Sequence, residues 1–147
     1  MSSRRRHLGG FRWEGVALAQ YKAGGAHFRD VTRQALFAEP GALPCELRYF
    51  EVAPGGHTSL ERHAHAHAVV VVRGSGRALV GDEIVELAGL DLVQVPPRTW
   101  HQFRASDTEP LGFLCLVACE RDRPERPDAR ELARLCERAE IGAFVRI

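Results

Sequence analysis

Between residues 45 and 120, short apolar runs alternate with polar positions, and each run ends at glycine or proline. The run at 47–52 ends at Pro54, and the β-branched run at 69–73 ends at Gly74. Strands joined by tight turns produce this punctuation, and no helical period of apolar residues competes with it. The pattern predicts an all-β domain over 45–120, built as a small barrel or sandwich.

Residues 1–44 predict an N-terminal arm ahead of this domain. Apolar and aromatic residues in the arm are spaced for short extended pieces, and Pro40, Gly41 and Pro44 close it. We therefore place the boundary between arm and barrel after residue 44.

Residues 121–147 differ in character from the barrel and predict a tail with one helix. Leu132, Leu135 and Cys136 follow helical spacing and form one apolar stripe, and Asp128 stands where an N-cap is expected. We expect this helix to pack on the outside of the barrel.

The length and charge of the chain limit the kinds of binding partner that we expect. The chain has 147 residues, which fits one domain, and its 20 basic and 19 acidic residues nearly cancel. A near-neutral chain is a poor ligand for nucleic acid or for an anionic membrane surface, so we expect neither as a partner. The longest apolar run, 111–119, is also well short of the ~20 residues of a membrane span. These features leave a small molecule as the expected partner.

The cysteines and the N-terminus suggest a reducing compartment. No apolar segment follows the three arginines at 4–6, so a secretory signal is not expected and a cytoplasmic protein is. Four residues along a strand would separate Cys115 from Cys119 by ~13 Å, which is too far for a disulfide. We expect free thiols at Cys45, Cys115, Cys119 and Cys136.

Histidines are concentrated in one short stretch: four of the seven lie from His57 to His67. Glu61 and His63 stand two residues apart and so share one face of a strand. His67 and His101 each begin a predicted strand. Three imidazoles and a carboxylate pointing into one barrel would bind a divalent metal. A solvated histidine-rich loop is the alternative, but the alanines and valines that flank the run favour the metal site.

The stretch from Gly55 to Arg104 resembles the two sequence motifs of the cupin superfamily. The first motif falls on Gly55, Glu61, His63, His67 and Gly74 with every spacing kept. The core of the second falls on Pro96, Arg98 and His101, although the glycine usual before that strand falls at Leu90, with Gly89 one place early. Glu61 stands where a histidine is usual and His67 where the glutamate is usual, so the set of three histidines and one carboxylate is retained. Arg98 replaces a usual glycine.

The resemblance implies the cupin double-stranded β-helix, a jelly-roll barrel, with a divalent metal held by Glu61, His63, His67 and His101. Such a ligand set leaves about two open positions on an octahedral ion. Manganese or iron suits this set best, and nickel, cobalt or zinc are alternatives. The resemblance also implies a turn between His63 and His67, which makes His65 a neighbour of the metal site rather than a ligand.

Further residues are candidates for contact with a substrate. Cys115 shares the parity of Phe113 and Val117, so its thiol would lie near the metal if that face points inward, where a cation would make it a nucleophile. A core thiol is the alternative interpretation. The substrate-binding candidates are Arg48, His65, Arg98, Trp100 and Phe103. The arginines could bind a phosphate or carboxylate, and the two aromatic residues could wall the pocket.

A narrower resemblance connects residues 58–63, 96–103, 112–115 and 120–124 with a bacterial cupin group. This group includes manganese-dependent methylthio-xylulose phosphate methylsulfurylases. The resemblance implies that a metal holds the ketose oxygens and stabilises an enediolate while a cysteine thiol, with Cys115 the candidate, or glutathione accepts the methylthio group. An Fe(II) dioxygenase and a non-catalytic, metal-stabilised sugar-binding cupin are the alternatives. Because small cupins pair through sheet edges, we also expect a homodimer, with the arm supplying a strand.

Overall fold

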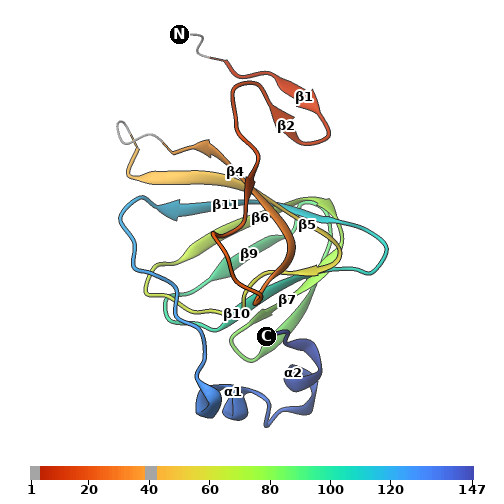
Figure 1. The fold of residues 1–147 in the computed structure, drawn as a ribbon, viewed down its shortest axis with the longest axis vertical. Helices are drawn as coiled ribbons and strands as arrows, with labels where there is room; N and C mark the ends of the chain where they lie inside the picture. The colour runs from red at the N-terminus through yellow and green to blue at the C-terminus, as the bar shows by residue number, and fades with distance from the viewer. Residues whose placement is uncertain (1–3, 39–42) are drawn as a thin grey trace.

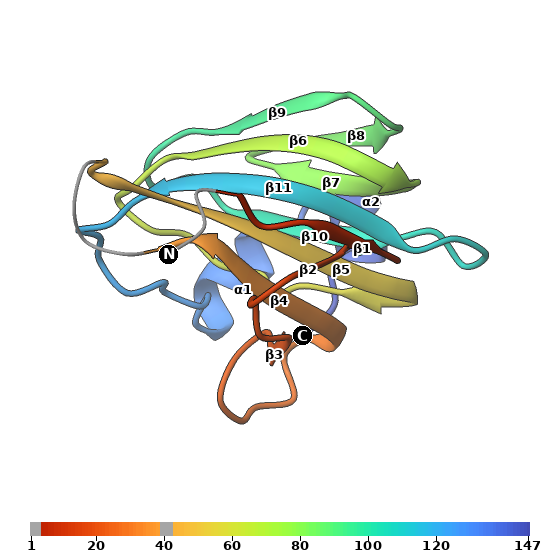
Figure 2. The same ribbon diagram turned by 90° about the horizontal axis from the view of Figure 1, so that it is seen from above.

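The computed structural model describes residues 4–38 and 43–147, and a strongly curled antiparallel sheet forms most of it (Figure 1). In spatial order, the strands of this sheet are β8 (Glu83–Leu87), β7 (Gly76–Val80), β10 (His101–Ala105), β5 (Cys45–His57), β11 (Leu111–Ala118), β6 (His67–Gly74) and β9 (Leu92–Val95). Figure 2 shows β9, β6 and β11 running side by side. The predicted all-β barrel is confirmed.

The core lies inside the curl of the sheet. On β11, Phe113, Cys115 and Val117 are buried on one face, as the parity of that strand predicts. The Phe113 ring stacks between Phe50 and Phe103, with centroid distances of 5.4 and 4.8 Å. Burying such rings is the main source of stability for a barrel of this size.

The expected end of a strand before Pro54 is wrong, because β5 continues to His57. Up to Val52 this strand pairs with β11, whereas at His57 it pairs with β10. The intervening residues form the bend where the partner changes, and Gly55 there has a φ of +74°. Proline and glycine are tolerated in a strand at such a bend, because the regular hydrogen-bond ladder is interrupted.

The segment expected to be an arm also contributes to the barrel wall. It contains the hairpin of β1 (His7–Gly9) and β2 (Arg12–Trp13), the short β3 (Ala19–Gln20) and the long β4 (Arg29–Phe37). β4 pairs with β5, and Val31 belongs to the barrel core. The chain between β2 and β4 crosses the front of the barrel (Figure 1). Pro40 and Gly41, predicted to close the arm, lie outside the described residues.

The tail contains the predicted helix, α1 (Ala129–Leu135), and a second helix, α2 (Ala139–Phe144), that the sequence pattern did not indicate. Asp128 caps α1 as expected and forms a reciprocal capping box with Glu131. Both helices lie at the end of the barrel opposite β1 and β2, where Ile141 and Phe144 are buried against Leu60. In the described part of the chain, no helix has the length and apolar character needed to cross a membrane.

Candidate metal centre

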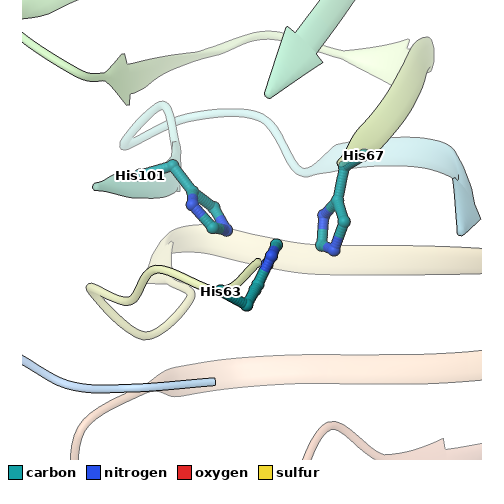
Figure 3. Close-up of side chains that lie close together, drawn as sticks. All are labelled: His63, His67 and His101. Atoms are coloured by element: carbon teal, nitrogen blue, oxygen red, sulfur yellow. The ribbon is translucent and has the colours of Figure 1, made fainter. Parts of the chain in front are cut away.

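Three histidines from separate parts of the chain meet at one point in the barrel. His67 begins β6, His101 begins β10, and His63 lies in the turn between β5 and β6. One nitrogen of each ring lies within 4.8 Å of the corresponding nitrogens of the other two. Figure 3 shows the rings pointing toward one another. The structure therefore brings together the three histidines that the sequence selected as ligands.

Backbone carbonyls orient two of these rings. The Nδ1 atom of His63 lies 2.7 Å from the His65 carbonyl oxygen, and Nδ1 of His101 lies 2.9 Å from that of Thr99. A carbonyl only accepts hydrogen bonds, so both Nδ1 atoms carry the proton and both Nε2 atoms present a lone pair. Nε2 of His63 is buried and has no hydrogen-bond partner among the described residues. A cation would satisfy this orphaned acceptor, so the residues present fit a metal.

The electrostatic state of the rings also suits a cation. Burial lowers the pKa of His63 to about 4 and that of His67 to about 2, and the neighbouring His101 ring adds to both shifts. Burial likewise lowers the pKa of His101. The three rings are therefore neutral near pH 7, which is the form that binds a metal.

Glu61, the expected fourth ligand, lies beside this centre. It is buried, and its backbone exchanges hydrogen bonds with His101, with N···O distances of 3.1 and 3.0 Å. Its carboxylate forms an ion pair with Lys22, whose ammonium also donates to the Ser59 hydroxyl at 3.2 Å. The Glu61 carboxylate thus faces a lysine from the arm, which the sequence pattern did not reveal.

A small cavity of about 30 Å³ adjoins the histidines. Its wall includes Glu61, His67 and His101 together with Tyr21, Phe103 and Cys115. Phe103 and Cys115 thus lie where the sequence placed them, and Tyr21 brings the arm to the same cavity. The volume is close to that of one water molecule in the liquid.

Cys115 is buried opposite Arg48 in the pairing of β11 with β5. The Arg48 guanidinium donates from Nη2 to the sulfur at 3.5 Å and stacks on the Phe50 ring at 4.8 Å. Burial raises the pKa of the Cys115 thiol, and the positive charge of Arg48 opposes that shift. Of the two effects, burial is the larger.

Trp100 and Arg98, like Arg48 and His65, are not among the described residues that line the cavity. Trp100 lies beneath the Arg62 guanidinium at 4.4 Å and packs against the apolar cluster of the tail helices. Arg98 is exposed, and its backbone N–H donates to the His63 carbonyl at 2.6 Å. Its φ of +57° is left-handed, which explains why the cupin motif usually has glycine there.

His65 lies next to the centre, as expected. Its ring stacks on that of His63 with a centroid distance of 3.7 Å and an interplanar angle of 5°. Its Nδ1 atom donates to the carboxylate of Asp122 in the tail at 2.8 Å. Asp122, Lys22 and Tyr21 were missed because contacts across 39 to 58 residues leave no local sequence signal.

The curled barrel with histidines converging inside it is the architecture of the cupins, and the chain belongs to the cupin family, whose domain matches residues 48–117. The chain is 52% identical over 136 residues to 1-methylthio-D-xylulose 5-phosphate methylsulfurylase from Rhodospirillum rubrum. This match covers 92% of the chain and 86% of that relative.

Solved structures agree with this assignment. A cupin 2 conserved barrel domain protein from Rhodopseudomonas palustris has a TM-score of 0.93 and 52% identity, covering 99% of this chain and 100% of its own. A cupin 2 domain-containing protein from Halorhodospira halophila has a TM-score of 0.77 and 42% identity, covering 100% of this chain and 98% of its own. The cupin fold that the resemblance implied is therefore confirmed.

Proposed function

We propose that the protein is a metal-dependent methylsulfurylase that transfers the methylthio group of a 1-methylthio-ketose phosphate to a thiol. The observation that carries the proposal is the Cys115 thiol, which shares one cavity with His67 and His101. The name of the Rhodospirillum rubrum relative supports the same reaction class. A buried thiol beside a metal centre suits sulfur transfer better than dioxygen activation or passive sugar binding.

The metal would be held by His63, His67 and His101, with Glu61 as the fourth ligand once its carboxylate leaves Lys22. Three neutral imidazoles and one carboxylate suit Mn(II) or Fe(II), while Ni(II), Co(II) and Zn(II) are weaker candidates. When bound, the cation supplies Lewis-acid polarisation of the ketone carbonyl and stabilises negative charge on its oxygen.

In the proposed reaction, the Cys115 thiolate attacks the methylthio sulfur of the substrate. A sulfur–sulfur bond forms, the bond between that sulfur and C1 breaks, and its electron pair passes to C1. Protonation at C1 gives the 1-deoxy-ketose phosphate. A second thiol such as glutathione then attacks the methyl disulfide on Cys115, carries the methylthio group away and restores the thiol. The thiol sulfur is oxidised and C1 is reduced, so no further oxidant is needed.

The remaining candidate residues would have different roles in this reaction. Arg48 lies against Cys115 and would stabilise its thiolate, and Phe103 offers an apolar wall to the methylthio group. His65, Arg98 and Trp100 remain proposed substrate contacts, and of these only Arg98 is exposed, which suits contact with a phosphate. Because Cys115 must stay a thiol, we propose that the protein works in a reducing compartment such as the cytoplasm.

The test is an anaerobic assay of the Mn(II)-loaded protein with methylthio-xylulose phosphate and excess glutathione, following the 1-deoxy-ketose phosphate. We expect turnover without oxygen, a loss of at least about a thousandfold in Cys115→Ala, and little change in the control Cys119→Ala. Metal content is measured in each variant, so that loss of the thiol is separated from loss of the centre.

Three results of this assay would overturn the proposal. Full activity of Cys115→Ala would remove the thiol step. Turnover that requires oxygen would indicate a dioxygenase. Thermal stabilisation by the substrate without any product would indicate a binding protein.

We also propose that the protein is a homodimer that pairs along β4. β3 covers only part of the outer edge of that strand, pairing with Thr32 and Arg33. Phe37 at the end of β4 and Leu43 are 64% and 61% exposed and line one pocket, so they would offer apolar surface to a second copy. A monomer in sedimentation equilibrium would contradict this part of the proposal.

A further inference from the structure

Asp122, in the tail just after β11, contacts the turn that carries His63. Its carboxylate accepts hydrogen bonds from the backbone N–H of Ala64 at 2.7 Å and from that of His65 at 3.2 Å. It also accepts from Nδ1 of the His65 ring at 2.8 Å. One side chain of the tail therefore holds both the backbone and the ring of His65, two residues after His63.

His65 in turn restrains the His63 ring in two ways. Its carbonyl oxygen lies 2.7 Å from Nδ1 of His63 and so fixes the tautomer of that ring. Its ring lies parallel to the His63 ring at 3.7 Å and so restricts the plane of that ring. Nε2 of His63, the nitrogen that faces the other two histidines, is thereby aimed without touching Asp122.

The segment that carries Asp122 is itself tied to the barrel. The backbones of Arg62 and Glu125 exchange hydrogen bonds with N···O distances of 3.0 and 2.8 Å. The Arg62 guanidinium also pairs with Glu125 and with Glu131 in α1. Since the tail is fixed beside Asp122, its carboxylate is a stable reference point although its side chain is 39% exposed.

The charge of Asp122 fits this role. The backbone N–H of Ala64, together with the His65 ring, holds the pKa of the Asp122 carboxyl well below its usual range. The group is therefore a carboxylate at any pH at which the histidines can bind a metal, and a carboxylate is a stronger acceptor than a neutral amide or hydroxyl.

We infer that Asp122 is a positioning residue of the metal centre, which fixes His65 and through it the ring orientation and tautomer of His63. This inference rests on the metal centre of the proposed function. Outer carboxylates that orient a metal-binding histidine typically raise metal affinity by about 10- to 100-fold. Within residues 120–124, Asp122 thus fixes the turn that carries His63.

Mn(II) binding to the purified full chain tests the inference, with free Mn(II) measured by electron paramagnetic resonance. We expect Asp122→Ala to raise the Kd for Mn(II) by about 10- to 100-fold and the matched control Asp82→Ala, at an exposed aspartate ion-paired with Arg138, to leave it unchanged. His65→Ala should weaken binding as well, and the double variant by less than the product of the two single effects. Asp122→Asn, which keeps an acceptor oxygen, should lie between wild type and Asp122→Ala.

A second readout needs no metal. In the metal-free protein, ring-nitrogen NMR shifts should show His63 as the Nδ1–H tautomer in wild type and as a mixture of tautomers in Asp122→Ala. A wild-type Kd together with a wild-type tautomer in Asp122→Ala would overturn the inference. If wild type binds no Mn(II) but the variant alters the tautomer, positioning by Asp122 stands and the metal centre of the proposed function fails.

Discussion

The Nε2 atom of His63 is the polar atom of this site that most clearly lacks a partner. It is buried without a hydrogen bond among the described residues, and such an atom typically costs about 1–3 kcal/mol. Its lone pair faces the rings of His67 and His101, whose pKa values burial also lowers. Because a divalent cation can accept electron pairs from several imidazoles at once, it would suit the three nitrogens that converge here.

Lys22 is ion-paired with Glu61, the carboxylate that we propose as the fourth ligand, so in the proposed site it would compete with the cation. Lys22→Met removes the ammonium, so a metal no longer has to displace it and no longer meets its charge. We expect the Kd for Mn(II) to fall about tenfold and the melting temperature of the metal-free protein to fall, because Glu61 loses its counter-ion. The control Arg6→Met breaks only the exposed pair with Glu14 and should change neither quantity. Unchanged or weaker metal binding in Lys22→Met would exclude Glu61 as a ligand.

The sequence predicted those residues of the candidate metal centre that follow a recognisable spacing along the chain. His63, His67 and His101 each stand at the beginning of a strand or in the turn before one, and these positions are visible in the pattern. Lys22 and Asp122 are not visible in it, because each reaches the centre from a segment whose own pattern gives no reason to fold there. Trp100 lies just before β10, under the Arg62 guanidinium and against the tail helices, and the local pattern contains no signal for these contacts.

Different strands and segments contribute different side chains to the candidate metal centre and its surroundings. β6 and β10 present histidines, β5 and β11 present Arg48 and Cys115 on one interior face, and the chain before β4 brings Tyr21 to the cavity. The tail holds the His63 turn from outside through Asp122. Tyr21 of the arm and Cys115 of β11 thus line the same small cavity as His67 and His101.

The cap of α1 contributes to the stability of the tail. Asp128 Oδ1 accepts from the Glu131 backbone at 2.8 Å, and the Glu131 side chain accepts from the Asp128 backbone at 3.0 Å. We expect Asp128→Ala to lower the free energy of unfolding by about 1 kcal/mol, measured by urea denaturation, because two N–H groups lose their acceptors. Asp107→Ala, at an exposed loop position, is the control. A loss no larger than that of the control would mean that α1 does not depend on its cap.

Helices and strands could be predicted from the sequence where the residues that determine them lie close together along the chain. The cap and apolar stripe of α1, and the glycine and proline boundaries of most strands, lie within a few residues. Prediction failed for α2, whose six residues are too few to show a helical period and whose helix depends on burying Ile141 and Phe144. It failed for β5 because the bend at Gly55 is made by a change of partner strand, which no local pattern encodes.

For the molecule as a whole, buried neutral histidines link stability to pH. In the unfolded chain these groups titrate near the ordinary value of 6.5, whereas burial lowers the pKa of His63 to about 4 and of His67 to about 2. Between these values the unfolded state binds more protons, so the free energy of unfolding falls as the pH falls. We expect the urea midpoint of the metal-free protein to drop steadily from pH 7 to pH 4.5. A midpoint that stays constant over that interval would contradict the burial of the two rings.

Elemental analysis of the purified protein measures whether His63, His67, His101 and Glu61 hold one divalent metal ion inside the barrel, as we propose. Wild type should contain about one manganese or iron ion per chain, and each of the four single alanine variants should contain far less while keeping its fold by circular dichroism. A wild-type protein that contains no stoichiometric divalent metal, even after incubation with Mn(II) or Fe(II), would contradict the account.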